Sequence, residues 1–126
     1  MKEPRWLSRS FFLAVHDRLV AEYGGAGGLR DADRLEAAVS RPRQSFSYGV
    51  TDLPELAGQY AGAIIIGHPF IDGNKRVGFV AAVTFLELNG LHFHADEVET
   101  TIKTLAFAAG ELGEVAYVEW LRVSCG

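Results

Sequence analysis

Nine consecutive residues, 68–76, bring together several types of side chain that could do chemistry. They read His-Pro-Phe-Ile-Asp-Gly-Asn-Lys-Arg and bring an imidazole, a carboxylate, an amide and two cations together directly before an apolar stretch. The histidine side chain has a reference pKa near ~6.5, and a residue of this type can accept a proton from an attacking hydroxyl at neutral pH. We interpret His68 as a candidate general base.

The rest of this motif predicts a phosphate site. The N-terminus of a helix has unpartnered backbone N–H groups and a partial positive charge, so Gly73, Asn74 and Lys75 could present donors to a phosphate. Lys75 and Arg76 add two cations, and Asp72 is suited to hold a magnesium ion that bridges phosphate oxygens. The combination predicts a site for a nucleoside triphosphate and Mg²⁺.

A purely structural interpretation of the same residues stands beside this one. Asp72, Gly73 and Asn74 could form a turn and a helix cap, Phe70 could be a core anchor, and the two cations could be solvated. For any single residue this interpretation is the better one. It explains the whole set poorly, because a structural cap needs no convergence of a histidine, an acid and two cations.

The other three histidines are weaker candidates for a functional site. His92 and His94 alternate as metal ligands on one side of a strand do, but no cysteine or further histidine supports them, and a surface turn is the better interpretation. His16 lies beside an apolar stripe, and we expect a satisfied residue at its edge.

Helical periodicity dominates the chain around the motif. Apolar residues recur at helical spacing over residues 7–23, until glycines end the pattern. Residues 77–88 are apolar on nearly every side, as in the central helix of a bundle. Asp96 is placed to cap a helix whose face carries Val98, Ile102 and Leu105, and a last helix is expected near residues 115–122.

Two further helices are expected between the first helix and the motif. Asp31 and Asp52 are placed to cap them, and the first must end near Arg41 because Pro42 disfavours helical geometry in the residue before it. Residues 43–51 should then form a loop or a short hairpin. The sequence therefore predicts an all-α bundle of about six helices, with residues 1–126 as a single domain.

Composition excludes several classes of partner. Lys plus Arg number 12 and Asp plus Glu 16 in 126 residues, a formal net charge of -4, and no basic block exists to track a nucleic acid. No apolar stretch approaches the roughly 20 residues of a membrane span, and the run at residues 11–15 is too short for a signal peptide. The single cysteine, Cys125, rules out a disulfide framework within the chain. We expect a cytoplasmic protein with neither nucleic acid nor membrane as a partner.

The motif at residues 68–76 resembles that of the Fic/Doc superfamily, His-x-Phe-x-Asp/Glu-Gly/Ala-Asn-Gly/Lys-Arg, and Lys75 is similar to the Doc (death on curing) type. Residues 23–25, 29–31, 35–38, 41–42 and 89–90 also resemble segments of small Doc-type toxins. The resemblance implies a compact helical fold and a toxin of a toxin-antitoxin operon. Such a toxin phosphorylates a threonine of elongation factor Tu with ATP and magnesium and so arrests protein synthesis.

The resemblance also implies roles for individual residues. They are His68 as general base, Asp72 as magnesium ligand, Asn74, Lys75 and Arg76 as phosphate holders, and Phe70 as buried anchor. Inhibitory helices of many Fic proteins carry Ser/Thr-x-x-x-Glu-Gly/Asn, which residues 51–56 fail at the last position, so a Phd-like antitoxin acting in trans is expected. Residues 46–48 could belong to a flap that docks the protein substrate by strand addition.

Two alternatives to the kinase remain. In Fic proteins that transfer AMP, glycine stands at position 75 and arginine at position 79, whereas this chain has Lys75 and Phe79. AMP transfer is therefore the second hypothesis. The third is a catalytically silent protein that binds an antitoxin, and the intact set of motif residues argues against it.

Overall fold

The computed structural model describes residues 2–126, and these form six α-helices. The helices are α1 (Arg9–Tyr23), α2 (Ala32–Ser47), α3 (Leu53–Ile65), α4 (Asn74–Leu88), α5 (Glu97–Ala108) and α6 (Glu114–Val123). Within residues 2–126 the only β pairing consists of two isolated bridges, Leu29 with Phe70 and Phe93 with Cys125. The all-α prediction is confirmed. No helix of this described part combines the length and the apolar character that crossing a membrane requires.

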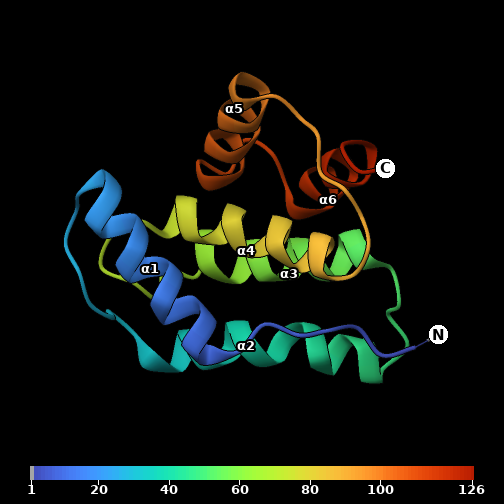
Figure 1. Ribbon diagram of the computed structural model, residues 1–126, viewed down its shortest axis with the longest axis horizontal. Helices are drawn as coiled ribbons and strands as arrows, with labels where there is room; N and C mark the ends of the chain where they lie inside the picture. The colour runs from blue at the N-terminus through green and yellow to red at the C-terminus, as the bar shows by residue number, and fades with distance from the viewer. Residues whose placement is uncertain (1) are drawn as a thin grey trace.

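Helices α3 and α4 lie side by side through the middle of the molecule (Figure 1). Helix α2 packs on one side of this pair, α5 and α6 lie on the other, and α1 packs against α4 and α2. The apolar pattern predicted α4 as the central helix, but α3 is the more enclosed of the two. Ten of its residues are buried against seven in α4, because α2, α4 and α6 all pack on it.

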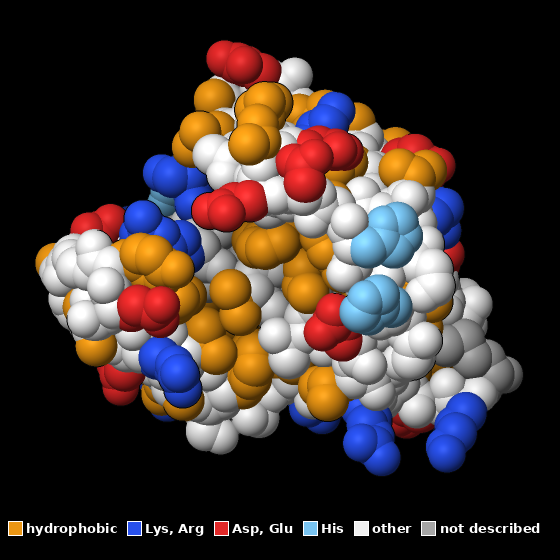
Figure 2. All heavy atoms as spheres, turned by 45° about the horizontal axis from the view of Figure 1, so that its top comes forward, with side chains coloured by type: hydrophobic (Ala, Val, Ile, Leu, Met, Phe, Trp, Pro, Cys, Tyr) orange, Lys and Arg blue, Asp and Glu red, His pale blue; other side chains and the backbone are white. Residues whose placement is uncertain are grey.

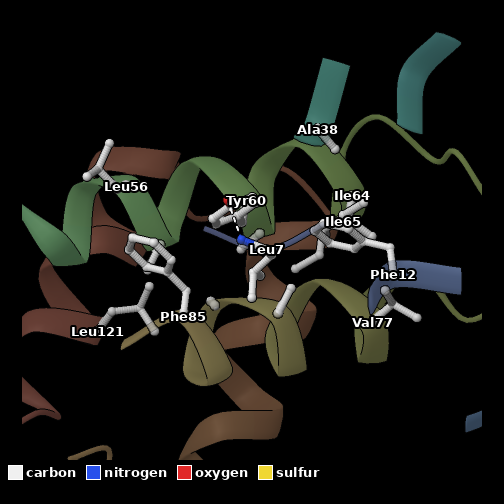
Figure 3. Close-up of a cluster of buried hydrophobic side chains, with 14 of the residues drawn as sticks. Leu7, Phe12, Ala38, Leu56, Tyr60, Ile64, Ile65, Val77, Phe85 and Leu121 are labelled. Atoms are coloured by element: carbon white, nitrogen blue, oxygen red, sulfur yellow. Dashed lines mark hydrogen bonds between the residues drawn. The ribbon is translucent and has the colours of Figure 1, made fainter. Parts of the chain in front are cut away.

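The core gathers where α1, α3 and α4 meet (Figure 3). Tyr60 of α3 is fully buried there, and its hydroxyl accepts a hydrogen bond of 3.0 Å from the backbone N–H of Leu7. Phe12 and Phe85 pack on the Tyr60 ring at centroid distances of 5.8 and 5.3 Å. The segment before α1 is thereby fastened to the centre of the bundle, which fixes α1 beside the start of α4.

Three of the helices begin at the aspartates that the sequence marked as caps. Asp31, Asp52 and Asp96 each accept a hydrogen bond from the backbone N–H three residues later, at 3.1, 3.0 and 2.7 Å. An N-cap side chain satisfies one of the donors that a helix start leaves unpaired. These three predicted starts are confirmed.

The predicted end of the second helix is wrong. Helix α2 continues through Pro42 to Ser47, so residues 43–47 form neither a loop nor a hairpin. Proline removes one helical hydrogen bond and costs roughly 3 kcal/mol. Burial of Pro42 and the packing of Phe46 on the Trp6 ring, at 5.6 Å between centroids, offset that loss. Phe46 lies in this helix and Tyr48 caps its end, so residues 46–48 do not form an extended strand, and substrate docking by this region stays a prediction.

The apolar face predicted for the helix after Asp96 points to solvent and not to the core. Val98, Ile102 and Leu105 of α5 have exposed fractions of 71%, 60% and 50%. The buried residues of this helix are Thr104 and Phe107. Helical periodicity therefore identified the helix correctly and assigned the wrong face to the interior.

The segment with His92 and His94 is extended and does not form the expected surface turn. The backbone of His92 exchanges two hydrogen bonds with Gly126, at 3.1 and 3.0 Å, and the N–H of His94 donates to Ser124 at 2.9 Å. Both imidazoles are exposed. Across residues 2–126 no group of three or more His, Cys, Asp and Glu side chains is arranged to hold a metal.

Candidate active site

Residues 68–76 lie between the end of α3 and the first turn of α4. The backbone N–H of His68 donates to the carbonyl of Ile64 at 3.0 Å, which extends the hydrogen bonding of α3 to the motif. A Cβ at Gly67 would lie 2.1 Å from the carbonyl oxygen of Ala63, so only glycine permits this tight approach. The last turn of α3 thus determines the position of the His68 backbone.

His68 has a backbone conformation that is uncommon for a residue with a side chain. Its φ is +52°, in the left-handed region, which costs on the order of 1–3 kcal/mol unless neighbours fix it. Arg30 donates from Nε to the His68 carbonyl at 2.9 Å and from Nη2 to the Gly67 carbonyl at 3.2 Å. Arg34 donates to the Gly67 carbonyl at 3.0 Å. Two arginines therefore hold the backbone that carries the imidazole.

The glycine-rich residues 24–28 and the segment after them pair with the motif. The N–H of Ile71 donates to the Gly28 carbonyl at 3.1 Å, and the N–H groups of Arg30 and Asp31 share the Pro69 carbonyl at 2.7 and 3.0 Å. The chain at Gly25 approaches Asp72 so closely that a Cβ there would lie 2.6 Å from Oδ2. Only glycine at position 25 permits this approach. Asp72 as a residue is exposed.

Asn74 uses its side chain inside the motif. Its Oδ1 accepts the N–H of Phe70 at 3.1 Å, and its Nδ2 donates to the Phe70 carbonyl at 2.9 Å and lies 3.4 Å from Nδ1 of His68. Asn74 is 7% exposed and Phe70 is fully buried. The amide therefore shapes the loop and orients the imidazole. Only the backbone N–H of Asn74 is left for the phosphate-holding role that the sequence suggested.

The two carboxylate oxygens of Asp72 differ, because only Oδ1 is hydrogen-bonded within the loop. Its Oδ1 accepts the backbone N–H of Gly73 at 2.8 Å, so that N–H is not free for a phosphate, contrary to expectation. Gly73 has a φ of +82°, which glycine adopts without strain. Among the ion pairs within residues 2–126, none involves Asp72. Asp72 is an exposed carboxylate beside two cations, and it fits the donor set of Mg²⁺, which takes one or two carboxylates together with phosphates and waters.

His16 contacts this loop directly. Its side chain is hydrogen-bonded, as expected, but it is buried, so the predicted place at the edge of the apolar stripe is wrong. His16 is 2% exposed, its Nε2 lies 2.9 Å from the Asp72 carbonyl oxygen, and its ring stacks on Phe70 at 4.0 Å with an interplanar angle of 9°. Sequence reasoning missed its contribution. The one available signal was the four-residue spacing from Phe12, which puts both residues on the buried face of α1.

A cavity of about 690 Å³ opens where α1, the motif and α5 meet. It is lined by Leu19, Tyr23, Asp72, Gly73, Asn74, Lys75, Arg76, Phe79, Val80, Glu97, Thr100, Thr101, Thr104 and Leu105. His68 is not among these residues, and it connects to the cavity through Asn74. A larger hollow of about 790 Å³ lies between α2 and α3 and contains none of the motif's ionisable side chains.

Positive charge is concentrated at one end of the 690 Å³ cavity. Lys75 and Arg76 are exposed, and neither forms an ion pair within the part of the chain that the structure describes. The guanidinium carbon of Arg76 lies 4.5 Å from the centroid of the Tyr23 ring, a cation–π contact that holds it over the cavity. No side chain caps α4, so its first-turn N–H groups add to the positive field.

Phe79, one helical turn after Lys75 and Arg76, closes the cavity with an apolar wall. Its ring packs edge-on against Phe93 at 5.5 Å between centroids and lies 6.5 Å from Trp120. The cationic region therefore ends at the first turn of α4. Beyond Lys75 and Arg76, the α4 side of the cavity presents the apolar residues Phe79 and Val80.

Comparison with known proteins identifies the family. The model of the Fic/DOC family matches residues 6–86, which include α1, α2, α3 and most of α4. A relative named "Protein kinase doc", from Escherichia phage P1, is 34% identical over 119 residues, 94% of each chain. Another, "Toxin Doc" from Mycolicibacterium smegmatis, is 42% identical over 77 residues, 59% of this chain and 58% of the relative. The chain therefore belongs to the Fic/DOC family and is of the Doc type.

Proposed function

We propose that this chain is a toxin that acts as a protein kinase, transferring a phosphoryl group from ATP to a threonine of elongation factor Tu and so inhibiting translation. The names of the two relatives support a toxin and a kinase. The observation that carries the proposal is the cavity in which Asp72, Lys75 and Arg76 lie together with the open N-terminus of α4. A target in the translation machinery implies a cytoplasmic protein.

In this proposal each motif residue has a defined step. His68 accepts the proton of the threonine hydroxyl as its oxygen attacks the γ-phosphorus of ATP. The bond from the γ-phosphorus to the bridging oxygen breaks, and ADP leaves with the electron pair. Lys75 and Arg76 stabilise the charge that develops on the phosphate oxygens. Asp72 would hold Mg²⁺, which supplies further charge neutralisation when bound.

The side chains at positions 75 and 79 favour phosphoryl transfer over AMP transfer. AMP-transferring relatives have glycine and arginine there, and these seat the terminal phosphates deep in the anion site. Here Lys75 and Phe79 both line the cavity, so the Lys75 side chain would occupy that space and Phe79 supplies no cation. The nucleotide should therefore bind with its γ-phosphate toward the attacking threonine.

Labelled ATP separates the two reactions. We expect purified chain to transfer label to elongation factor Tu from γ-labelled ATP and not from α-labelled ATP, with one phosphate of about 80 Da added to the intact mass. An AMP-sized increment with incorporation of α-label would contradict the kinase while retaining the same site.

The same experiment addresses the catalytically silent alternative. The His68→Ala variant should transfer no label and should be harmless when expressed in cells that the wild type arrests. Equal arrest by both would favour a protein that acts by binding alone.

We further propose that a Phd-like antitoxin inhibits the chain by laying an amphipathic helix along α5. The exposed residues Val98, Ile102 and Leu105 form an apolar stripe, and Leu105 also lines the cavity. Figure 2 shows hydrophobic side chains gathered over α5 and in the hollow beneath it. An acidic residue on such a helix could pair with Lys75 and Arg76 at the end of the cavity. This charge complementarity favours an amphipathic helix over an entirely apolar one.

A further inference from the structure

We propose that His16 is a positioning residue for the magnesium site, holding the backbone of Asp72 so that the carboxylate faces the cation. The inference rests on the proposed function, because it requires Asp72 to be the metal ligand. It assigns a role to a residue of α1 that lies outside the motif altogether.

The hydrogen bond between His16 and Asp72 has only one possible direction. The partner of His16 Nε2 is a backbone carbonyl oxygen 2.9 Å away, and a carbonyl only accepts. Nε2 therefore carries a proton and donates it. Since His16 is 2% exposed, water cannot readily replace this donor.

One peptide group couples His16 to the carboxylate. The Asp72 carbonyl and the Gly73 N–H belong to the same planar unit, so they cannot turn independently. His16 binds the carbonyl at 2.9 Å, and the N–H binds Oδ1 of Asp72 at 2.8 Å. Rotation of this peptide would withdraw the N–H from Oδ1 and release the carboxylate. A hydrogen bond to the carbonyl also polarises the N–H and strengthens it as a donor.

The second carboxylate oxygen is the one left for a cation. Oδ2 of Asp72 lies close to the backbone at Gly25, where a Cβ would approach it to 2.6 Å, and Asp72 itself is exposed and lines the 690 Å³ cavity. Fixing Oδ1 on Gly73 fixes the direction of Oδ2 as well. His16 thus acts on the metal ligand through the peptide, without touching the metal.

His16 also has a packing role, and two variants separate the roles. His16→Phe keeps an aromatic ring that can stack on Phe70, where the present centroid distance is 4.0 Å, but it removes the donor. His16→Gln loses the ring and retains an N–H donor at about the position of Nε2. Comparable thermal unfolding midpoints would show that both variants fold.

The test measures binding of Mn²⁺, a substitute that accepts the oxygen ligands of Mg²⁺. Electron paramagnetic resonance of free Mn²⁺ gives its dissociation constant in the presence of a non-hydrolysable ATP analogue. Loss of a partner that orients a metal ligand typically weakens metal binding 10–100-fold, so we expect at least about tenfold weaker binding in His16→Phe. His16→Gln should stay within about threefold of the wild type, and metal-free nucleotide binding should change little in either.

The outcomes distinguish this inference from the proposed function. If wild-type chain with nucleotide binds no Mn²⁺, the metal site fails and the role of His16 fails with it. If the wild type binds and His16→Phe binds equally well, or His16→Gln binds no better than His16→Phe, only the role of His16 is overturned.

A measurement on the wild type covers the case in which the Phe variant does not fold. The Nε2-bound proton of His16 is buried and hydrogen-bonded, so its signal should be observable by ¹⁵N-edited NMR. That signal should shift when Mg²⁺ is added to nucleotide-saturated chain. An unmoved signal would overturn the inference.

Discussion

Asp72 contributes to this site in two ways, by a hydrogen bond that shapes the loop and by the negative charge of its carboxylate. Its Oδ1 accepts a hydrogen bond within the loop, its side chain is exposed, and Lys75 and Arg76 line the same cavity without carboxylate partners in the described structure. Asparagine at position 72 would keep a polar side chain of the same size and lose the negative charge. The substitution Asp72→Asn therefore separates the effect of the charge from the effect of the hydrogen bond to Gly73.

Asp72→Asn should reduce phosphoryl transfer at least as much as His68→Ala. Removal of a general base typically lowers a rate by about 10²–10⁴, and phosphoryl transfer depends strongly on charge neutralisation. Initial rates at limiting Mg²⁺ give the comparison. Asp33→Asn, which removes an exposed carboxylate in the first turn of α2, is the control. Full activity of Asp72→Asn at limiting Mg²⁺ would refute the metal assignment.

Lys75→Gly should weaken γ-phosphoryl transfer and open space for the reversed nucleotide. Loss of one charge-stabilising donor typically lowers a rate by about 10²–10³. We expect incorporation of label from α-labelled ATP to rise above that of the wild type. Lys75→Met is the matched control, because it removes the charge and keeps the volume, and it should lose γ-transfer without gaining α-transfer. Equal α-label in both variants would argue against the steric explanation.

Residue types alone were enough to find the motif but not the groups that support it. The three aspartate caps were predictable because a cap acts on a backbone N–H only three residues away. His16 and Arg30 were not, because their partners in the motif lie 56 and 38 residues further along the chain. Only the folded arrangement of α1 and the glycine-rich loop brings these residues to the motif.

At the scale of elements, local rules located the starts of helices better than their ends and faces. The rule that proline ends a helix failed at Pro42, where tertiary burial of that residue and of Phe46 outweighs a local penalty. Periodicity failed for α5, since Val98 and Ile102 have helical spacing and yet face solvent. Both errors arise because packing partners, which the sequence does not identify, decide the outcome.

Asp52 offers an element-scale test, because it caps α3 and also pairs with Arg122 of α6. The hydrogen bond from Arg122 lowers the pKa of Asp52 below its ordinary value of 3.8, and the Glu55 N–H adds to this effect against the opposing effect of burial. The folded pKa is depressed, so the stabilisation is present above 3.8 and is lost as the pH falls through the folded pKa.

Asp52→Asn keeps a good cap and removes the charge. It should lower the free energy of unfolding at pH 7 by no more than about 1 kcal/mol, since the pair is partly exposed. It should also flatten the fall of stability between about pH 5 and pH 2. Urea unfolding across this range measures both effects. Asp33→Asn should change neither, and a wild-type acid profile in Asp52→Asn would contradict the role of the pair.

At the scale of the whole molecule, charge and apolar surface are distributed unevenly. The chain has a net charge of -4, yet the cavity presents Lys75 and Arg76 beside the open start of α4. The apolar stripe of α5 flanks the same cavity. A partner that covers α5 would therefore also cover the cavity that we propose as the nucleotide site, and one binding event would then inhibit the proposed reaction.

The stripe on α5 gives the last prediction, which concerns the antitoxin. Val98 and Ile102 are exposed and do not line the cavity, so replacing both by serine should leave phosphoryl transfer close to that of the wild type. Full burial of one such side chain contributes about 1.5–3 kcal/mol, so the double variant should bind the antitoxin at least about tenfold more weakly. A Phd-like antitoxin serves as the probe, by co-purification and by isothermal titration calorimetry. Val115→Ser, which alters an 86% exposed valine of α6 outside the stripe, should bind as the wild type does.

Unchanged affinity in the α5 variant, or an equal loss in Val115→Ser, would place the antitoxin on another surface. Weaker binding together with restored phosphoryl transfer at antitoxin concentrations that silence the wild type would tie inhibition to this face.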